Sequence, residues 1–253
     1  MKDKLWLWCH EAGSYNGQYN LPRASRMTPA EAAYYMGVSN VLFITYGNRP
    51  EPPFDQHLLA LSPLDRVVWS IVGDSSTSRT DLDEVLALAP RFPNLAGAIM
   101  DDFFHAASAS GDISRVSVAE LQRYQTRLKS AARPLDLYVV VYAHDLGLPI
   151  QPYLEPCDAI TFWTWTSDKL ADLEANFARL EAIAPGKRKL LGCYLWDFGA
   201  GRPMPLERMQ YQCRLGQDWL RQGRIDGMIL LSSPLCDLGL ETVEWAREWI
   251  KGL

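Results

Sequence analysis

The fold is most readily inferred from one stretch of the sequence, Leu95-Ala96-Gly97-Ala98-Ile99-Met100, which runs directly into Asp101-Asp102. A short apolar run of this kind is typical of a strand that is buried on both faces, as in a parallel sheet covered by helices. The residues Ser117-Val118-Ala119-Glu120 then form a capping box, which predicts the start of a long helix that ends near residue 131. A second apolar run follows at 135–142, so this part of the chain is expected to form a strand–helix–strand unit.

The same alternation extends in both directions along the chain. Runs rich in Val, Ile, Leu and aromatic residues are predicted as strands at 4–9, 40–46, 66–72, 95–100, 135–142, 158–165, 189–196 and 227–232. Helices are predicted between them at 30–37, 81–88, 117–131, 167–183, 205–222 and 240–250, with weaker helical segments at 54–65 and 149–156.

Eight strands that alternate with helices in 253 residues predict a (β/α)8 barrel, that is, a TIM-type barrel of the α/β class. The main competing fold is a doubly wound open sheet, which usually carries a glycine-rich turn after its first strand. Residues 9–14, at the end of the first predicted strand, contain no such turn. No linker, repeat or low-complexity segment interrupts the pattern, so residues 1–253 are expected to form a single domain.

Composition and charge argue against two classes of binding partner, nucleic acids and membranes. The 25 Lys and Arg against 30 Asp and Glu give a net charge of −5, which argues against a nucleic-acid partner, because binding to a phosphate backbone usually needs a basic face. No apolar run is long enough for a membrane helix, so no membrane partner is expected either. The sequence shows no secretory signal, and a cytoplasmic location is expected unless a removed leader made the protein secreted or periplasmic. The oligomeric state is left open.

The cysteines are expected to be reduced. They are odd in number and contain no CxxC pair, which argues against a disulfide framework and against a zinc ribbon. We interpret all five as packing residues, at positions 9, 157, 193, 213 and 236.

Polar and aromatic residues gather where the predicted strands end. In a barrel of this kind the active site lies at the C-terminal ends of the strands. Loops are polar in any protein, but His10-Glu11 and Asp101-Asp102 adjoin apolar strands directly, which favours a functional site. His10 and Glu11 are expected to lie in the same cleft as Asp101. Further candidates for contact with a substrate are Tyr46, Tyr142 and His144.

The pair Asp101-Asp102 is the sharpest feature among these residues. Adjacent strand residues point to opposite faces, so both carboxylates can face the barrel axis only if the strand ends there and the chain turns. Two carboxylates beside apolar neighbours repel and desolvate each other, which raises the pKa of one and keeps it protonated near neutral pH. A carboxylic acid in that state can act as a general acid. The structural alternative is that one of them caps a turn or pairs with an arginine.

This arrangement resembles glycoside hydrolases with a TIM-barrel fold, without matching one specific family. Several such families place a catalytic carboxylate just after the fourth strand, in a setting similar to Gly97-Ala98-Ile99-Met100-Asp101. The resemblance implies hydrolysis of a glycosidic bond in a carbohydrate substrate by two carboxylates, with no cofactor or metal ion. Asp101 or Asp102 takes one role, and Asp197 is favoured over Glu11 for the other. The DxxDxDxE pattern of chitinase-like enzymes and an Asn-Glu pair at the fourth strand are absent.

Aromatic residues are expected to form a wall beside the acidic pair. Trp163 and Trp165 lie two residues apart near the end of one predicted strand, and Tyr194 and Trp196 repeat this spacing on the next. Residues two apart on a strand share a face, and sugar rings stack on aromatic rings through their apolar C–H faces. These four residues are therefore predicted to bind the carbohydrate, unless they simply fill the core.

Two other functions stay open from the sequence alone. A metal-dependent sugar isomerase, epimerase or hydrolase would use residue types that bind divalent cations, here His10, Glu11, Asp101, His144 and Asp197. A non-catalytic carbohydrate-binding barrel is the third interpretation, because a barrel does not imply activity.

Overall fold

The protein folds around a closed barrel of parallel strands. Its structure is a computed structural model that describes residues 1–108 and 111–253. The barrel order is β1-β2-β3-β4-β5-β6-β7-β10, and β10 pairs with β1 to close the ring. The strands are Leu5–Cys9 (β1), Asn40–Phe43 (β2), Arg66–Val72 (β3), Leu95–Met100 (β4), Asp136–Tyr142 (β5), Ala159–Trp163 (β6), Arg188–Tyr194 (β7) and Gly227–Leu231 (β10). The predicted (β/α)8 barrel is confirmed.

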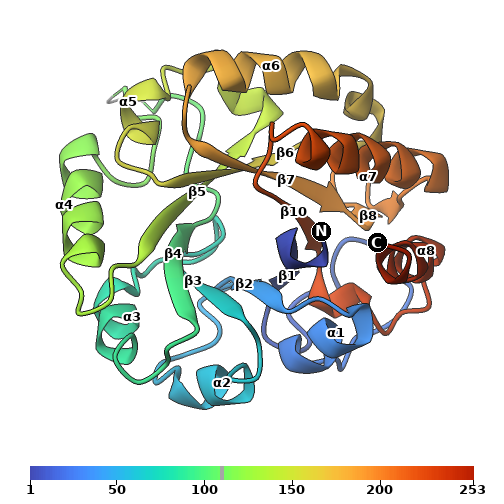
Figure 1. Ribbon diagram of the computed structural model, residues 1–253, viewed down its shortest axis with the longest axis horizontal. Helices are drawn as coiled ribbons and strands as arrows, with labels where there is room; N and C mark the ends of the chain where they lie inside the picture. The colour runs from blue at the N-terminus through green and yellow to red at the C-terminus, as the bar shows by residue number, and fades with distance from the viewer. Residues whose placement is uncertain (109–110) are drawn as a thin grey trace.

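Helices surround the barrel and follow the strands in turn (Figure 1). Their bounds are Pro29–Met36 (α1), Asp55–Ala60 (α2), Leu82–Leu88 (α3), Val118–Lys129 (α4), Gln151–Leu154 (α5), Leu173–Ile183 (α6), Leu206–Arg221 (α7) and Glu241–Lys251 (α8). The helix predicted at 167–183 is divided, because a 3-10 turn at Ser167–Asp172 precedes α6. Within the described ranges, none of the helices has the length and apolarity needed to cross a bilayer.

Two helix starts follow from local sequence. The Thr28 hydroxyl accepts a hydrogen bond from the backbone N–H of Glu31, whose carboxylate in turn accepts from the backbone N–H of Thr28, so a full capping box opens α1. The Ser117 hydroxyl accepts from the backbone N–H of Glu120 and caps α4, as the sequence predicts.

Several strands end earlier than the sequence predicts, and this determines what reaches the barrel mouth. The strand predicted at 40–46 ends at Phe43, and the one at 158–165 ends at Trp163. The strand predicted at 189–196 ends at Tyr194, after which Trp196–Asp197 (β8) and Arg202–Pro203 (β9) form a small antiparallel hairpin. The alternation of faces along a strand therefore no longer applies to residues 165 and 196.

Large aromatic side chains fill the barrel where the neighbouring strand carries glycine. A Cβ atom added at Gly192 in β7 would lie 2.1 Å from the indole ring of Trp163 in β6. A Cβ atom at Gly97 in β4 would similarly lie 3.0 Å from the ring of Tyr138 in β5. This pairing of large and small residues packs the interior, so the free space begins only above it, at the C-terminal ends of the strands.

All five cysteines are free and buried, in keeping with their predicted role as packing residues.

Candidate active site

A cavity of about 570 Å³ opens at the C-terminal ends of the barrel strands. Its volume lies within the range of small-molecule sites in proteins. Every barrel strand, or the loop that follows it, contributes to the lining: Trp8, His10, Tyr15, Tyr19, Tyr46, Asp74, Ser75, Asp101, Asp102, Phe104, His105, Arg115, Tyr142, His144, Trp163, Trp165, Tyr194, Phe198 and Leu231.

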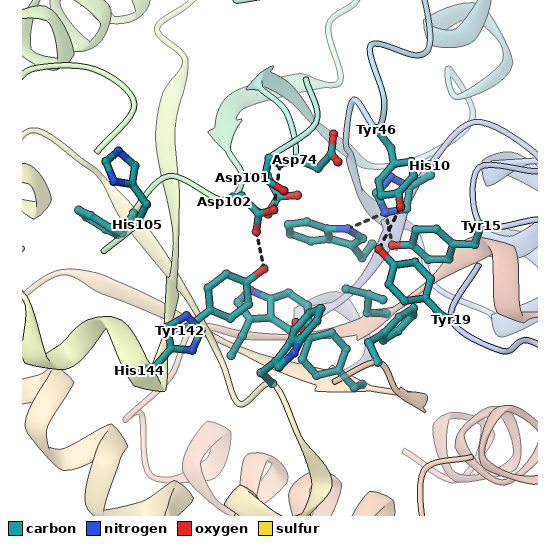
Figure 2. Close-up of a pocket in the computed structure, with 18 of the residues that line it drawn as sticks. His10, Tyr15, Tyr19, Tyr46, Asp74, Asp101, Asp102, His105, Tyr142 and His144 are labelled. Carbon is teal, nitrogen blue, oxygen red and sulfur yellow. Dashed lines mark hydrogen bonds between the residues drawn. The ribbon is translucent and has the colours of Figure 1, made fainter. Parts of the chain in front are cut away.

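Asp101 and Asp102 lie side by side in this cavity (Figure 2). Asp101 continues the pairing of β4 with β3, since its backbone N–H donates to the carbonyl of Val72 at 2.8 Å. Asp102 then adopts a φ of 40°, in the left-handed region that side chains rarely occupy. The chain turns at that point, and the turn brings two consecutive carboxyl groups to one cavity, which a continuing strand would not do.

Asp101 has the environment of a general acid. Its side chain is only 6% exposed, and its Oδ1 atom accepts a hydrogen bond from the backbone N–H of Asp102 at 2.9 Å. Burial, together with the charges of Asp102 and Asp74, raises the pKa of Asp101 well above its ordinary value, while the hydrogen bond from the Asp102 N–H and the charge of Arg115 act in the opposite direction. Asp101 therefore keeps its proton under conditions in which an exposed aspartate has lost it.

Asp102 is held by two donors. The Tyr142 hydroxyl donates to Oδ1 at 2.9 Å, and the backbone N–H of Ser75 donates to Oδ2 at 2.9 Å. The two neighbouring carboxyl groups thus have unlike surroundings: Asp101 is buried, whereas Asp102 accepts a hydrogen bond at each oxygen.

The loop after β3 is fixed so that Ser75 can reach Asp102. Asp74 accepts from the backbone N–H of Gly47 at 3.0 Å and from the Thr77 hydroxyl at 2.6 Å. Arg115 donates to the carbonyls of Gly73 at 2.9 Å, of Asp74 at 2.7 Å and of Thr77. The guanidinium of Arg115 is therefore committed to this loop, and its role in the site is to position the loop.

His10 lies on the other side of the cavity and is neutral. Its Nδ1 atom is 3.2 Å from the Ile44 carbonyl, and its Nε2 atom accepts from the Trp8 indole N–H at 3.1 Å. A carbonyl only accepts and an indole only donates, so the proton resides on Nδ1. The Tyr15 hydroxyl, 2.6 Å from Nε2, is then a donor as well. Burial lowers the pKa of His10 to about 4, against smaller opposing effects of the Ile44 carbonyl and Asp74.

An aromatic wall borders the acidic pair. Trp163 is buried at the bottom of the cavity with its ring centroid 5.0 Å from that of Tyr194, whereas Trp165 is 38% exposed at the mouth. Trp165 meets Tyr194 and Tyr142 edge to face, at centroid distances of 5.8 and 6.0 Å. The cavity thus offers ring faces and hydroxyl groups on the side next to Asp102.

Most of the residues predicted from the sequence are brought together here, and three are not. Glu11 points away and pairs with Arg49 outside the cavity. Trp196 is buried and donates from its indole to the carbonyl of Tyr19 at 3.1 Å. Asp197 belongs to β8 and is fully buried, and it accepts from the Ser167 hydroxyl at 2.5 Å and from Arg202 at 3.4 Å.

The predicted partner role of Asp197 is therefore not supported by its position, and Asp102 is the carboxylate beside Asp101. His144 does line the cavity, but as an exposed residue at its rim that stacks on the ring of Tyr142 with centroids 5.1 Å apart. In the described part of the chain, no group of three or more His, Cys, Asp or Glu residues is arranged to hold a metal ion.

Sequence reasoning missed several lining residues. Tyr15, Tyr19 and Phe198 belong to loops, and their contacts with one another have no counterpart in local sequence pattern. Asp74 carries a usable signal, because it follows β3 by two residues, as Asp102 follows β4. Arg115 lies far along the loop after β4 and carries none.

Comparison with known proteins identifies the fold. No protein-family model matches the sequence, and no curated protein matches it. Similar structures include a chitinase domain from Pyrococcus furiosus, with a TM-score of 0.64 and 13% identity, covering 98% of this chain and 93% of that one. A candidate α-L-fucosidase from Bacteroides thetaiotaomicron has a TM-score of 0.62 and 13% identity, and the match covers 88% of this chain and 85% of that one.

A third similar structure is a xylanase and α-amylase inhibitor protein in complex with trehalose, with a TM-score of 0.59 and 15% identity, covering 98% of each chain. Both enzymes and an inhibitor are thus among the neighbours, at identities too low to carry more than architecture. What these comparisons establish is that the chain has the TIM-barrel fold.

Proposed function

We propose that this protein is a glycoside hydrolase in which Asp101 is the general acid and Asp102 is its ionised partner. The observation that carries the proposal is the unlike environment of these two consecutive carboxyl groups in one cavity. Asp101 is buried with a raised pKa, and Asp102 is held by Tyr142 and Ser75. Pairs of titratable groups with divergent environments are how enzymes divide acid and base roles.

In the proposed reaction, Asp101 gives its proton to the glycosidic oxygen as the bond from that oxygen to the anomeric carbon breaks. The positive charge that develops on the sugar ring is stabilised by the carboxylate of Asp102. Water then adds to the anomeric carbon, and the proton it loses returns to the carboxyl pair.

The surrounding aromatic residues support a carbohydrate substrate. The exposed ring of Trp165 offers a face on which the apolar side of a sugar ring can stack. Burial raises the pKa values of Tyr15, Tyr142 and Tyr194, so their hydroxyl groups stay neutral and can exchange hydrogen bonds with sugar hydroxyls.

The role of Asp101 is tested by a leaving-group comparison on Asp101→Asn. For an alkyl glycoside or oligosaccharide, whose leaving group needs protonation, kcat/KM should fall by about 100- to 10,000-fold. For a dinitrophenyl glycoside, whose leaving group departs as a stable anion, the loss should be far smaller. A panel of glycosides of the common hexoses and pentoses first identifies the sugar.

Asp168→Asn is the matched control, because Asp168 is an exposed aspartate in the loop after β6 that does not line the cavity. This variant should keep the wild-type rate on both substrates. Equal losses on both leaving groups in Asp101→Asn, or no loss on either, would show that Asp101 is not the general acid.

The alternatives give different results in the same assays. A chelator should leave the rate unchanged, whereas a loss that a divalent cation restores would favour the metal-dependent reaction. Glycan binding that survives Asp101→Asn, with no turnover by the wild-type protein on any glycoside of the panel, would favour a non-catalytic carbohydrate-binding barrel.

A further inference from the structure

A second cavity lies beside the candidate active site. Its volume is about 530 Å³, close to that of the first cavity. It is formed by the loops that follow β1 and β2, and its lining consists of Glu11, Ala12, Gly13, Ser14, Asn16, Gln18, Tyr46, Gly47 and Arg49. We refer to it as the outer cavity.

The two cavities meet at Tyr46, which lines both. The Tyr46 hydroxyl is 2.9 Å from the hydroxyl of Tyr19, in the first cavity, and donates to the side-chain oxygen of Gln18, in the outer cavity. His10 and Glu11 are consecutive in sequence, and one lines each cavity. Figure 2 shows Tyr46 beside His10, Tyr15 and Tyr19 at the edge of the first cavity. Tyr46 is therefore the side chain that the walls of both cavities share.

The outer cavity is polar and electrically balanced. Glu11 accepts from the Nε atom of Arg49 at 2.8 Å through Oε2. In the described part of the chain, Glu11 Oε1 and the terminal nitrogens of Arg49 make no side-chain hydrogen bond, so they can bond to a ligand. The Arg49 side chain is 69% exposed and that of Glu11 25%. The guanidinium of Arg49 donates hydrogen bonds and the carboxylate of Glu11 accepts them, which suits the neighbouring hydroxyl groups of a sugar. The charges of the two side chains cancel, so the outer cavity does not favour an ionic ligand.

We propose that the outer cavity binds a further, uncharged sugar residue of the substrate, so that the substrate is an oligosaccharide rather than a glycoside with a small aglycone. This inference rests on the proposed function, because it assumes that the first cavity holds the sugar beside the bond that is cleaved. Arg49 and Glu11 hydrogen-bond the hydroxyls of the further residue, and Tyr46 separates the two sugars.

The test measures binding without turnover, in the Asp101→Asn background. The probes are the methyl glycosides of glucose, N-acetylglucosamine, xylose and mannose, and the tetrasaccharides built from the same sugars. Tryptophan fluorescence reports the Kd, since Trp165 lies at the mouth of the first cavity. One of the tetrasaccharides should bind at least about tenfold more tightly than its methyl glycoside, equivalent to about 1.4 kcal/mol.

Adding Arg49→Gln should remove most of this gain and leave the Kd of the methyl glycoside within about twofold. The matched control is Arg91→Gln, which removes an exposed arginine that pairs with Asp55 at 3.4 Å and lines neither cavity. The control should bind both probes as the background protein does. Glu11→Gln should repeat the effect of Arg49→Gln, since it removes the other half of the pair.

Two outcomes overturn the inference, and they are distinguishable. If small glycosides are cleaved but the tetrasaccharide gain is absent, or is unchanged by Arg49→Gln, the outer cavity is not a sugar site and the proposed function stands. If the wild-type protein neither binds nor cleaves any probe, the proposed function fails and this inference fails with it.

Discussion

Asp101 sets the pH dependence expected of the reaction. A general acid works only while protonated, and burial with nearby carboxylates raises the pKa of Asp101. The rate should therefore fall as pH rises through that raised pKa, at a higher pH than an exposed aspartate would allow. Carboxyl ¹³C NMR should follow Asp101 directly, and Asp102→Asn should lower its pKa by removing the adjacent charge. An Asp101 resonance that titrates like that of an exposed aspartate would contradict the assignment.

His10 makes the folded state sensitive to acid. Its pKa is about 4 when folded, against 6.5 ordinarily, so between these values the unfolded chain binds a proton that the folded protein does not. The contribution of neutral His10 to the stability of the folded state is complete at pH values above the ordinary histidine pKa of 6.5, and it is lost as the pH falls toward about 4. At 1.36 kcal/mol per pKa unit, it amounts to about 3 kcal/mol.

Urea unfolding of the wild type and of His10→Asn checks this prediction. Asparagine can keep the donor to the Ile44 carbonyl while removing the titration. Between about pH 7 and pH 4, the variant should lose about 3 kcal/mol less stability than the wild type. Equal losses in the two proteins would mean that His10 does not titrate as its burial implies.

At the scale of elements, the barrel depends on glycines that make room for aromatic rings. In Gly192→Ala the new methyl group would collide with the indole of Trp163, which is 1% exposed and cannot retreat into solvent. Overpacking of this kind costs about 1–3 kcal/mol. Thermal unfolding should report the loss, and sugar binding should weaken because Trp163 lines the cavity.

Gly147→Ala is the control for this change, since an added Cβ atom at Gly147 meets nothing within 4 Å. Its stability should stay within about 0.5 kcal/mol of the wild type. A Gly192→Ala variant as stable as Gly147→Ala would show that the barrel interior can rearrange around Trp163.

A comparison of the observed and predicted elements shows which of them could be predicted from the sequence pattern. Strands such as β3 and β4 have the predicted bounds, because burial on both faces produces an uninterrupted apolar run. The β8–β9 hairpin is not predicted, although it buries Asp197 and Trp196 and so removes two predicted residues from the cavity. Its position depends on Trp196 bonding to Tyr19, a contact between residues 177 positions apart.

The residues of the candidate site also fall into those that the sequence pattern predicts and those that it does not. Residues that adjoin a strand, such as His10 and Asp101, can be predicted because strand direction fixes where they emerge. Tyr15 and Tyr19 cannot, because they reach the cavity only when the loop after β1 folds back over the barrel mouth. The division of His10 and Glu11 between two cavities is likewise a property of the folded loops.

At the scale of the whole molecule, the fold was the most predictable feature, because closure of the barrel follows from eight buried strands alternating with helices. That residues 1–253 form a single domain stays a prediction. Three carboxyl groups line the first cavity, Asp74, Asp101 and Asp102, and in the proposed reaction Asp101 is the one that keeps its proton.

The carboxyl groups of the first cavity should disfavour acidic sugars. Arg115 lines the same cavity and its charge acts on Asp101, but its Nη1 and Nη2 atoms already donate to backbone carbonyls instead of to a sugar carboxylate. A neutral aryl glycoside should be cleaved with a kcat/KM at least about tenfold above that of the matched uronide. Glucoside and glucuronide, or galactoside and galacturonide, form suitable pairs. Preference for the uronide would require an unengaged cation in the cavity and would contradict this picture.

The left-handed backbone at Asp102 has a consequence for the stability of variants at this position. At a φ of 40°, the backbone conformation costs a glycine about 1 kcal/mol less free energy than it costs a residue with a Cβ atom. Asp102→Gly and Asp102→Ala both lack the carboxylate, so they differ mainly in backbone strain, and the glycine variant should unfold at a higher urea concentration. Under the proposed function both variants also lack the ionised partner of Asp101, so the backbone conformation at position 102 favours a residue that the proposed reaction cannot use.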